Sequence, residues 1–266
     1  MSRKKRILLY TLFCIGVLSF FIYARFPGKV VENYILAVAA ESYPAAFLSF
    51  GAVSPSLPPG LKLENITLGF RENPEANIRV EKFTVMPRLL RYISGRSAFT
   101  VNALAYGGSL KASVDFPSFS LKPPPAKAEI IFEGLSIEKC AYLKDKLGRT
   151  VTGKLGGTFI FSGDSQLDFT IQKGSYQLLE SLFGFERLDF NKVEGQVTLK
   201  GGVLRIAKLR LTGDKINCSL KGEVTLKSDL KNSEINLNGT MEIANMGKKI
   251  SMLITGTMGR VQTKYI

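Results

Sequence analysis

The stretch KINCSLKGEVTLK, residues 215–227, alternates apolar or small residues with polar ones along its whole length. The apolar or small residues stand at the even positions from Ile216 to Leu226, and Lys, Asn, Ser, Glu or Thr stands between them. Successive side chains of a strand point to opposite faces, so the pattern predicts one long strand with an apolar face and a polar face. Strands of globular domains usually run about five or six residues. What covers so long an apolar face is therefore the question that decides the fold.

The same two-residue period recurs from residue 61 to the end of the chain. Short turns that contain Gly, Asp or Asn separate the segments, and one of them, at Gly107 and Gly108, predicts a hairpin. This arrangement favours an antiparallel meander over a parallel α/β sheet. Two segments depart from the period: 137–148 is predicted to be a helix that ends at Gly148, and 174–185 is predicted to be a helix or a loop. The other predicted strands are 61–70, 76–86, 97–106, 109–116, 126–135, 154–163, 166–174, 187–202, 204–213, 233–244 and 248–259.

The predicted fold is mainly β: an elongated, curved antiparallel sheet with one or two short helices, preceded by a transmembrane helix. The helical segments are too small to cover such a sheet, so its apolar face has two interpretations. In a sandwich, a second sheet covers it and its side chains form a closed core. In an open groove, lipid tails or apolar strands of a partner cover it. The candidate groove residues are Ile216, Leu220, Val224, Leu226, Ile235, Leu237, Met241, Ile243, Met252 and Ile254.

The N-terminus predicts a membrane anchor. Residues 7–24, ILLYTLFCIGVLSFFIYA, carry no charge and reach the length of a membrane-spanning helix. A cleaved signal peptide is the rival interpretation because AVAA at 37–40 resembles a cleavage site, but that site lies too far from the apolar run. We expect an uncleaved single-pass anchor, with the N-terminus held in the cytoplasm by the basic tip, residues 1–6. The basic residues of this tip are Arg3, Lys4, Lys5 and Arg6.

Residues 25–60 are predicted to connect the anchor to an extracytoplasmic β domain, residues 61–266. Within them, 29–42 predicts a helix with an apolar face, which either lies on lipid or caps one end of the sheet. The prolines in 52–60 predict a stiff connector.

Composition argues against most enzyme classes and against a nucleic-acid partner. The chain has no His, which excludes His-dependent triads, His metal ligands and the commonest general base. No phosphate-binding loop or nucleophile elbow occurs in the sequence. The net charge is +14, but the basic residues are spread singly over polar strand positions, as on a solvated sheet face. We expect no catalytic residue, no metal and no cofactor.

The three cysteines, at 14, 140 and 218, have the spacing of neither a zinc site nor a redox motif. Cys14 and Cys218 have the sequence context of small apolar residues. A disulfide between Cys140 and Cys218 is an open alternative for a domain outside the cytoplasm.

The order of strands and glycines resembles a known family. LRIAKLRLTGDKINCSLKGEVTLKSDLKNSEINLNGTMEI at 204–243 and ITGTMG at 254–259 are similar to the terminal region of the type II secretion system protein N family, among its AsmA-like relatives. PPGLKLENITLGF at 58–70 and YGGSLKASVDF at 106–116 resemble the front half of AsmA-like proteins. The resemblance implies a bitopic protein of a bacterial inner membrane whose β domain, residues 61–266, is an elongated periplasmic sheet, and it supplies no catalytic residues.

Two functions are expected from this resemblance and from the amphipathic sheet. In the first, the protein is an accessory of the type II, or general, secretion pathway whose sheet docks partner subunits. In the second, it is an AsmA-like protein that binds or transfers phospholipid in the cell envelope, with the candidate groove residues facing acyl chains. An enzyme is not expected.

Overall fold

The computed structural model describes residues 3–56, 59–71, 73–119, 124–141, 143, 150–182, 185–229, 232–244 and 248–265. These residues form one antiparallel sheet of 15 strands. From β3 onward each strand pairs with the next one in the chain, and β1 and β2 both pair with β3. The strands are β1 (Ala46–Ser49), β2 (Ala52–Ser56), β3 (Gly60–Phe70), β4 (Asn73–Pro87), β5 (Ala98–Ala105), β6 (Gly108–Asp115), β7 (Lys127–Ser136), β8 (Lys154–Phe161), β9 (Ser165–Leu182), β10 (Phe185–Lys200), β11 (Val203–Thr212), β12 (Ile216–Thr225), β13 (Glu234–Ile243), β14 (Lys248–Thr257) and β15 (Arg260–Tyr265).

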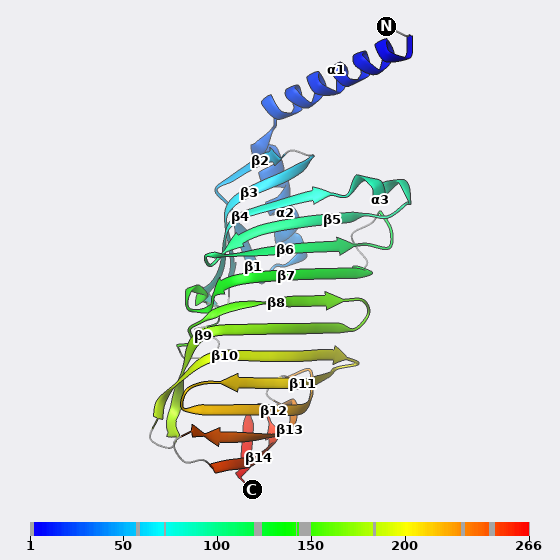
Figure 1. The fold of residues 1–266 in the computed structure, drawn as a ribbon. Helices are drawn as coiled ribbons and strands as arrows, with labels where there is room; N and C mark the ends of the chain where they lie inside the picture. The colour runs from blue at the N-terminus through cyan, green and yellow to red at the C-terminus, as the bar shows by residue number, and fades with distance from the viewer. Residues whose placement is uncertain are drawn as a thin grey trace.

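The predicted antiparallel meander is therefore confirmed, and Figure 1 shows its strands stacked like rungs from the N-terminal end to the C-terminus. The predicted hairpin is present: Ala105 pairs with Gly108 across a turn in which Tyr106 and Gly107 have φ of 54° and 74°. Two successive residues with positive φ match the right-handed twist of the flanking strands. The sequence pattern thus placed this turn to within one residue.

The helices are few and lie towards the N-terminal end of the sheet. α1 spans Arg3–Ala24, α2 spans Gly28–Ser42, and α3 spans Leu89–Ile93. A short 3₁₀ turn, η1, spans Ile137–Lys139. The helix predicted at 137–148 is described only in its first part, because residues 142 and 144–149 lie outside the described part of the chain.

The N-terminal helix is present where the anchor was predicted, although the side chains at 8, 12 and 22 lie outside the described part. Among the residues that the structure describes, no helix is both long and apolar enough to cross a membrane.

Three expectations about the sheet were wrong in detail. The sheet begins at Ala46 rather than at residue 61, because β1 and β2 already pair with β3. Residues 52–56, expected to be part of a proline-rich connector, form β2 at an edge of the sheet, where Pro55 is tolerated because an edge strand leaves some N–H groups unpaired. Residues 174–182, expected to be a helix or a loop, belong to the long strand β9.

The alternation that identifies strands is interrupted within β9 by one residue. Lys173 has a left-handed φ of 49°, yet the pairing with β10 continues on both sides of it, with Ile171 opposite Val193 and Gly174 opposite Phe190. On one side of Lys173 the apolar side chains of the pair stand at odd positions, such as Ile171 and Val193. On the other side they stand at even positions, such as the buried Phe190. A residue in this conformation shifts the phase of the strand, so a strict two-residue period could not detect the continuation.

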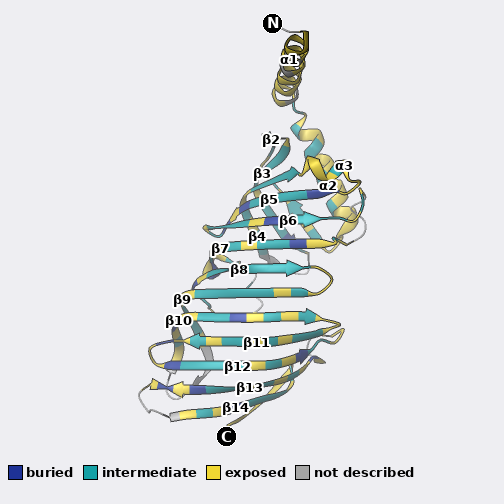
Figure 2. Ribbon diagram, turned by 45° about the vertical axis from the view of Figure 1, so that its right-hand side comes forward, coloured by how far each residue is buried: buried dark blue, intermediate teal, exposed yellow. Residues whose placement is uncertain are grey.

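The sheet has no second layer among the described residues, so the sandwich interpretation is wrong. Apart from sheet neighbours, the elements that pack closely are α2 with β1 and β2, and α3 with β5. The chain exposes 17746 Å², whereas a compact globular protein of 29.3 kDa exposes about 11,500 Å². Figure 2 accordingly shows mostly exposed and intermediate residues, with buried ones scattered along the strands.

Candidate functional site

Nine of the ten candidate groove residues lie on one face of β12, β13 and β14. Residues directly opposite each other in an antiparallel pair share a face of the sheet. Ile216 lies opposite Ile243, Val224 lies opposite Ile235, and Leu237 lies opposite Ile254. The remaining members of the nine, which alternate with these along the strands, are Leu220, Met241 and Met252. The structure therefore brings the predicted set together.

Leu226 is the exception. It follows the last residue of β12, and its backbone N–H donates a hydrogen bond of 2.8 Å to the carbonyl of Gly202. Its side chain is half-buried beside the turn before β11 rather than within the paired part of the strand. It contributes to the rim of the apolar surface.

The apolar surface extends well beyond the residues that the sequence singled out. Following the pairing from β14 back to β5, the apolar side chains continue strand by strand on the same face. We call the paired part of this surface, together with the nine residues above, the apolar face. The members missed by sequence reasoning include Val101, Leu110, Ile130, Phe132, Phe159, Leu167, Phe169, Val197, Ile206 and Leu209. The signal was available, because their segments show the same alternation as 215–227.

Aromatic rings lie over glycines in the middle of the apolar face. Gly157 and Gly195 both lie opposite Phe169, one on each side of it. A Cβ at Gly195 would collide with the ring of Phe169, and a Cβ at Gly157 would come within 2.8 Å of the ring of Phe132. The absence of a side chain at these positions lets the rings lie flat along the sheet. Glycines that weaken a strand elsewhere are thus covered here by neighbouring aromatics within the same layer.

Burial along the apolar face is uneven. At its C-terminal end, Ile216, Met241 and Met252 form a buried cluster, with exposed fractions of 4%, 4% and 8%. Leu188 of β10 packs against this cluster, which shows that the shifted end of β10 contributes to the same face. Towards the middle of the apolar face, side chains such as Ile206 and Leu237 are only half-buried, because no described element lies over them. Their remaining exposure is what a ligand could cover.

The opposite face is polar and carries ion pairs between neighbouring strands. Arg205 pairs with Glu223 at 2.8 Å, and Glu194 accepts hydrogen bonds from Lys192 and Lys208. These two lysines hold the pKa of Glu194 at about 2, below its ordinary 4.5. Such exposed pairs contribute little stability each, but they make this face well hydrated. The contrast between the two faces is the main chemical feature of the molecule.

The reactive groups within the described residues include a serine beside a lysine, two thiols and a tyrosine. Ser136 receives a hydrogen bond from the ammonium group of Lys154, but Ser136 is only 1% exposed, so its hydroxyl cannot reach a substrate. Cys140 and Cys218 are free thiols, and burial raises the pKa of Cys218. Burial also raises the pKa of Tyr106. Within the described ranges, no three His, Cys, Asp or Glu side chains group as metal ligands.

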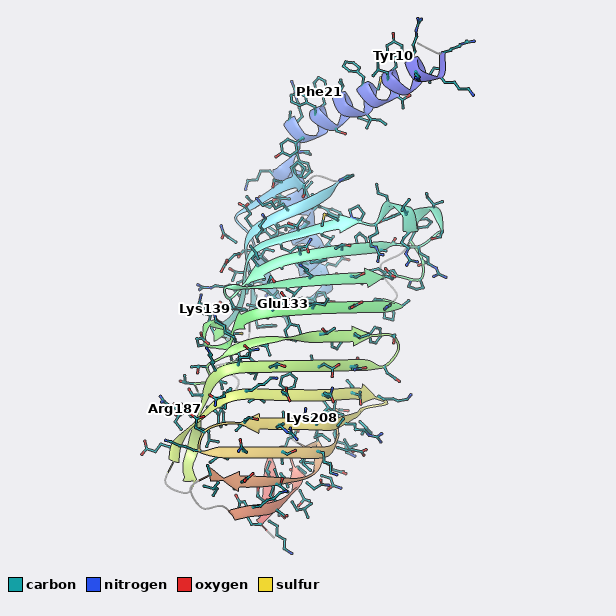
Figure 3. All side chains as sticks on the ribbon, viewed as in Figure 1. Tyr10, Phe21, Glu133, Lys139, Arg187 and Lys208 are labelled. Atoms are coloured by element: carbon teal, nitrogen blue, oxygen red, sulfur yellow. The ribbon has the colours of Figure 1, made fainter. Side chains whose placement is uncertain are left out.

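The basic residues that are expected to hold the N-terminus in the cytoplasm lie on α1. Arg3, Lys4, Lys5 and Arg6 form its first turns and are exposed. The apolar run that follows is also exposed, with Tyr10 at 67% and Phe21 at 57% (Figure 3). α1 therefore makes its apolar surface available on all sides.

No protein-family model, no curated protein and no solved structure matches this chain. The resemblance to the type II secretion system protein N family stays a prediction from the residues quoted above.

Proposed function

We propose that this protein binds the acyl chains of phospholipids on the apolar face of its sheet, as a membrane-anchored protein of the bacterial cell envelope. The observation that carries the proposal is an apolar face that runs from β5 to β14 and over which no element of the described residues lies as a second layer. Exposed apolar surfaces of this extent are rare in proteins unless they contact a ligand, a partner or a membrane. Acyl chains suit this surface because they are long, flexible and without specific polar contacts.

The proposed anchor would place the sheet next to membrane lipid, the proposed ligand. The uncharged run 7–24 has 18 residues, which as a helix at about 1.5 Å per residue gives a length of about 27 Å. This is close to the hydrocarbon thickness of a bilayer, about 30 Å. With Arg3 to Arg6 on the cytoplasmic side, the sheet would stand on the periplasmic side, its first strands next to the lipid. The apolar face and its ligand would then be neighbours.

The experiment uses the full chain in liposomes that contain a phospholipid with a photoactivatable acyl chain. After illumination and proteolysis, mass spectrometry locates the lipid adducts. The proposal expects adducts on peptides of the apolar face, such as the one that contains Leu237. Adducts confined to α1 would refute it, because they would show only the lipid that surrounds an anchor.

A second candidate function is docking of secretion subunits in the type II pathway, as the resemblance implies. One observation favours it: β15 is an edge strand whose six residues are all exposed. An exposed edge offers backbone N–H and C=O groups to an added strand of a partner. Cross-linking from β15 to secretion subunits in intact cells would support docking, and its absence together with lipid adducts on the apolar face would favour lipid binding.

A further inference from the structure

The short helix α3 presents three large aliphatic side chains to the outside. Leu89, Leu90 and Ile93 are 57%, 82% and 85% exposed. They lie in the connection between β4 and β5, and in Figure 1 this connection projects from the part of the sheet nearest α1. Phe119, from the connection that follows β6, is 58% exposed and lies next to Tyr92, with ring centroids 5.8 Å apart. We call α3 with its flanking residues 88–96 the tip.

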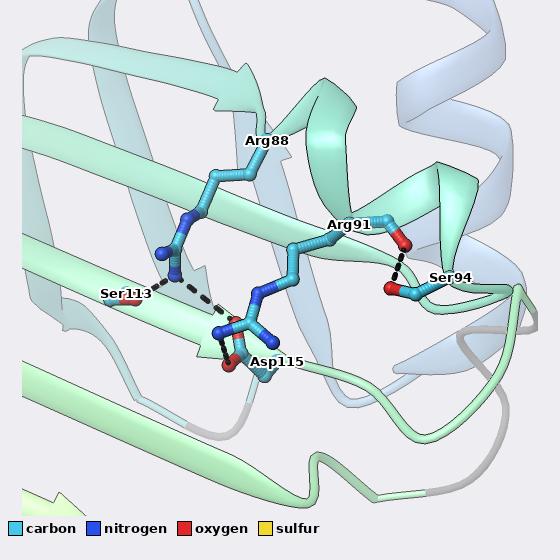
Figure 4. A network of polar contacts seen from close by, with 5 residues as sticks. All are labelled: Arg88, Arg91, Ser94, Ser113 and Asp115. Carbon is cyan, nitrogen blue, oxygen red and sulfur yellow. Dashed lines mark hydrogen bonds and ion pairs between the residues drawn. The ribbon is translucent and has the colours of Figure 1, made fainter.

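Ion pairs fix which side of α3 faces outward. Arg88 donates to the hydroxyl of Ser113 at 3.1 Å and pairs with Asp115 at 3.3 Å, and Arg91 pairs with the other carboxylate oxygen of Asp115 at 3.9 Å (Figure 4). Residues three apart share a side of a helix, so Arg88 and Arg91 both turn towards β6. Leu89 and Leu90, which lie between the two arginines, and Ile93, which follows them, are turned away from the sheet.

The tip is held to the sheet by further bonds. The backbone N–H of Arg88 donates to the carbonyl of Ala98, and the buried Ser97 donates from its hydroxyl to the carbonyl of Phe119. The two connections that carry the exposed apolar side chains are therefore tied together. A fixed apolar surface loses less conformational entropy on binding than a flexible loop does.

Charge identifies the kind of surface that the tip fits. The sequence of the tip, RLLRYISGR, contains three arginines and no acidic residue, and Asp115 balances only one of them. Aliphatic side chains bordered by arginines are typical of segments that lie in the interface of a bilayer with anionic lipids, where the apolar groups enter the acyl boundary and the cations stay among the headgroups.

We infer that the tip inserts Leu89, Leu90 and Ile93 into the surface of an anionic bilayer, the same membrane that carries α1. The sheet would then have two attachments, and the N-terminal end of the apolar face would be held against the lipid. This inference rests on the membrane anchoring proposed above. It goes beyond that proposal because it assigns a second lipid contact to residues outside the apolar face.

The absence of Trp from the chain allows a direct test. Leu90→Trp in the full chain introduces a single indole at the tip, and Gln262→Trp, at an exposed site on the polar face of β15, is the matched control. Each variant is reconstituted in liposomes that contain phosphatidylglycerol, and only protein that floats with the liposomes is measured. The inference expects the emission of Trp at position 90 to shift to the blue and to lose most of its intensity to lipids brominated in their acyl chains, while the control stays unquenched.

Equal quenching of the two variants, or quenching of neither, would overturn the inference. The variant with Leu90→Asp and Ile93→Asp gives a second measurement: it should still float through α1, but hydrogen exchange at residues 88–96 should become faster than in the parent chain. Unchanged exchange would also overturn the inference. Failure of the anchor would appear as loss of flotation, and failure of acyl binding would appear as missing adducts on the apolar face, so the three results are separable.

Discussion

Replacing two aliphatic side chains in the middle of the apolar face should remove bound lipid at a small cost in stability. Ile206 and Leu237 both lie opposite Gly222, one on each side, and both are half-buried. Complete burial of such a side chain contributes about 1.5–3 kcal/mol. Half-burial contributes about half of this, so the double variant Ile206→Asn, Leu237→Asn should lose about 2 kcal/mol. Water can reach both amides, so neither is left without a hydrogen-bond partner.

Met241→Asn provides the contrast from the buried cluster. Met241 is 4% exposed, so its replacement removes a buried side chain, which costs about 2–5 kcal/mol of stability. It also leaves a buried amide without a hydrogen-bond partner, which costs about 1–3 kcal/mol more. This single substitution should therefore cost more than the double one. Lys221→Asn, on the polar face of the neighbouring strand β12, should change stability by about half a kcal/mol or less and leave lipid binding intact.

The assay combines urea unfolding of the full chain in liposomes with the yield of photo-crosslinked lipid on β12 to β14. We expect the double variant to unfold at a lower urea concentration than the parent chain but at a higher one than Met241→Asn, and to lose most of its adducts. If the double variant is less stable than Met241→Asn, the middle of the face is a closed core and the reasoning fails. If its adduct yield equals that of the parent, lipid does not bind there.

Three further predictions follow from other parts of the molecule. Gly195→Ala should destabilise the sheet by about 1–3 kcal/mol, measured by urea unfolding, because the new Cβ collides with the ring of Phe169. Glu194 has a lowered pKa in the folded state, so the stability it contributes is present above about pH 4.5 and is lost as the pH falls towards 2. Glu194→Gln should flatten this part of the stability profile. N-terminal sequencing of the membrane fraction should recover the start of the chain, because the anchor at 7–24 is expected to be uncleaved.

Controls sharpen these predictions. Gly156→Ala is matched to Gly195→Ala, since the nearest atom to its new Cβ would be 3.4 Å away, and it should cost clearly less. Equal costs for the two would show that the ring contact is unimportant. For the pH profile, Glu64 is the matched case, because a hydrogen bond from Lys62 lowers its pKa; Glu64→Gln should flatten the profile less than Glu194→Gln, whose carboxylate has two lysine partners. A soluble product that begins near Glu41 would contradict the uncleaved anchor.

Local pattern was sufficient for the strands and for one face of the sheet. Alternation at 215–227 and in its neighbours predicted both the antiparallel order and the grouping of residues such as Leu220 and Met252, because side-chain direction in a strand depends only on the parity of position. It failed at Lys173, where one left-handed residue shifts the phase, and at 52–56, where prolines suggested a connector. These failures have local causes that the two-residue period does not include.

The sequence by itself determined that this chain has a long sheet with an apolar and a polar face, and that its N-terminus carries an uncharged run after a basic tip. Only the tertiary structure decided that a single layer forms and that α3 points its aliphatic side chains outward. The reason is that periodicity reports relations between residues two apart, whereas the number of layers depends on whether distant strands of one sheet come to face each other. In the described part of this protein they remain neighbours in one sheet from β3 to β15, and no described element forms a layer over the apolar face.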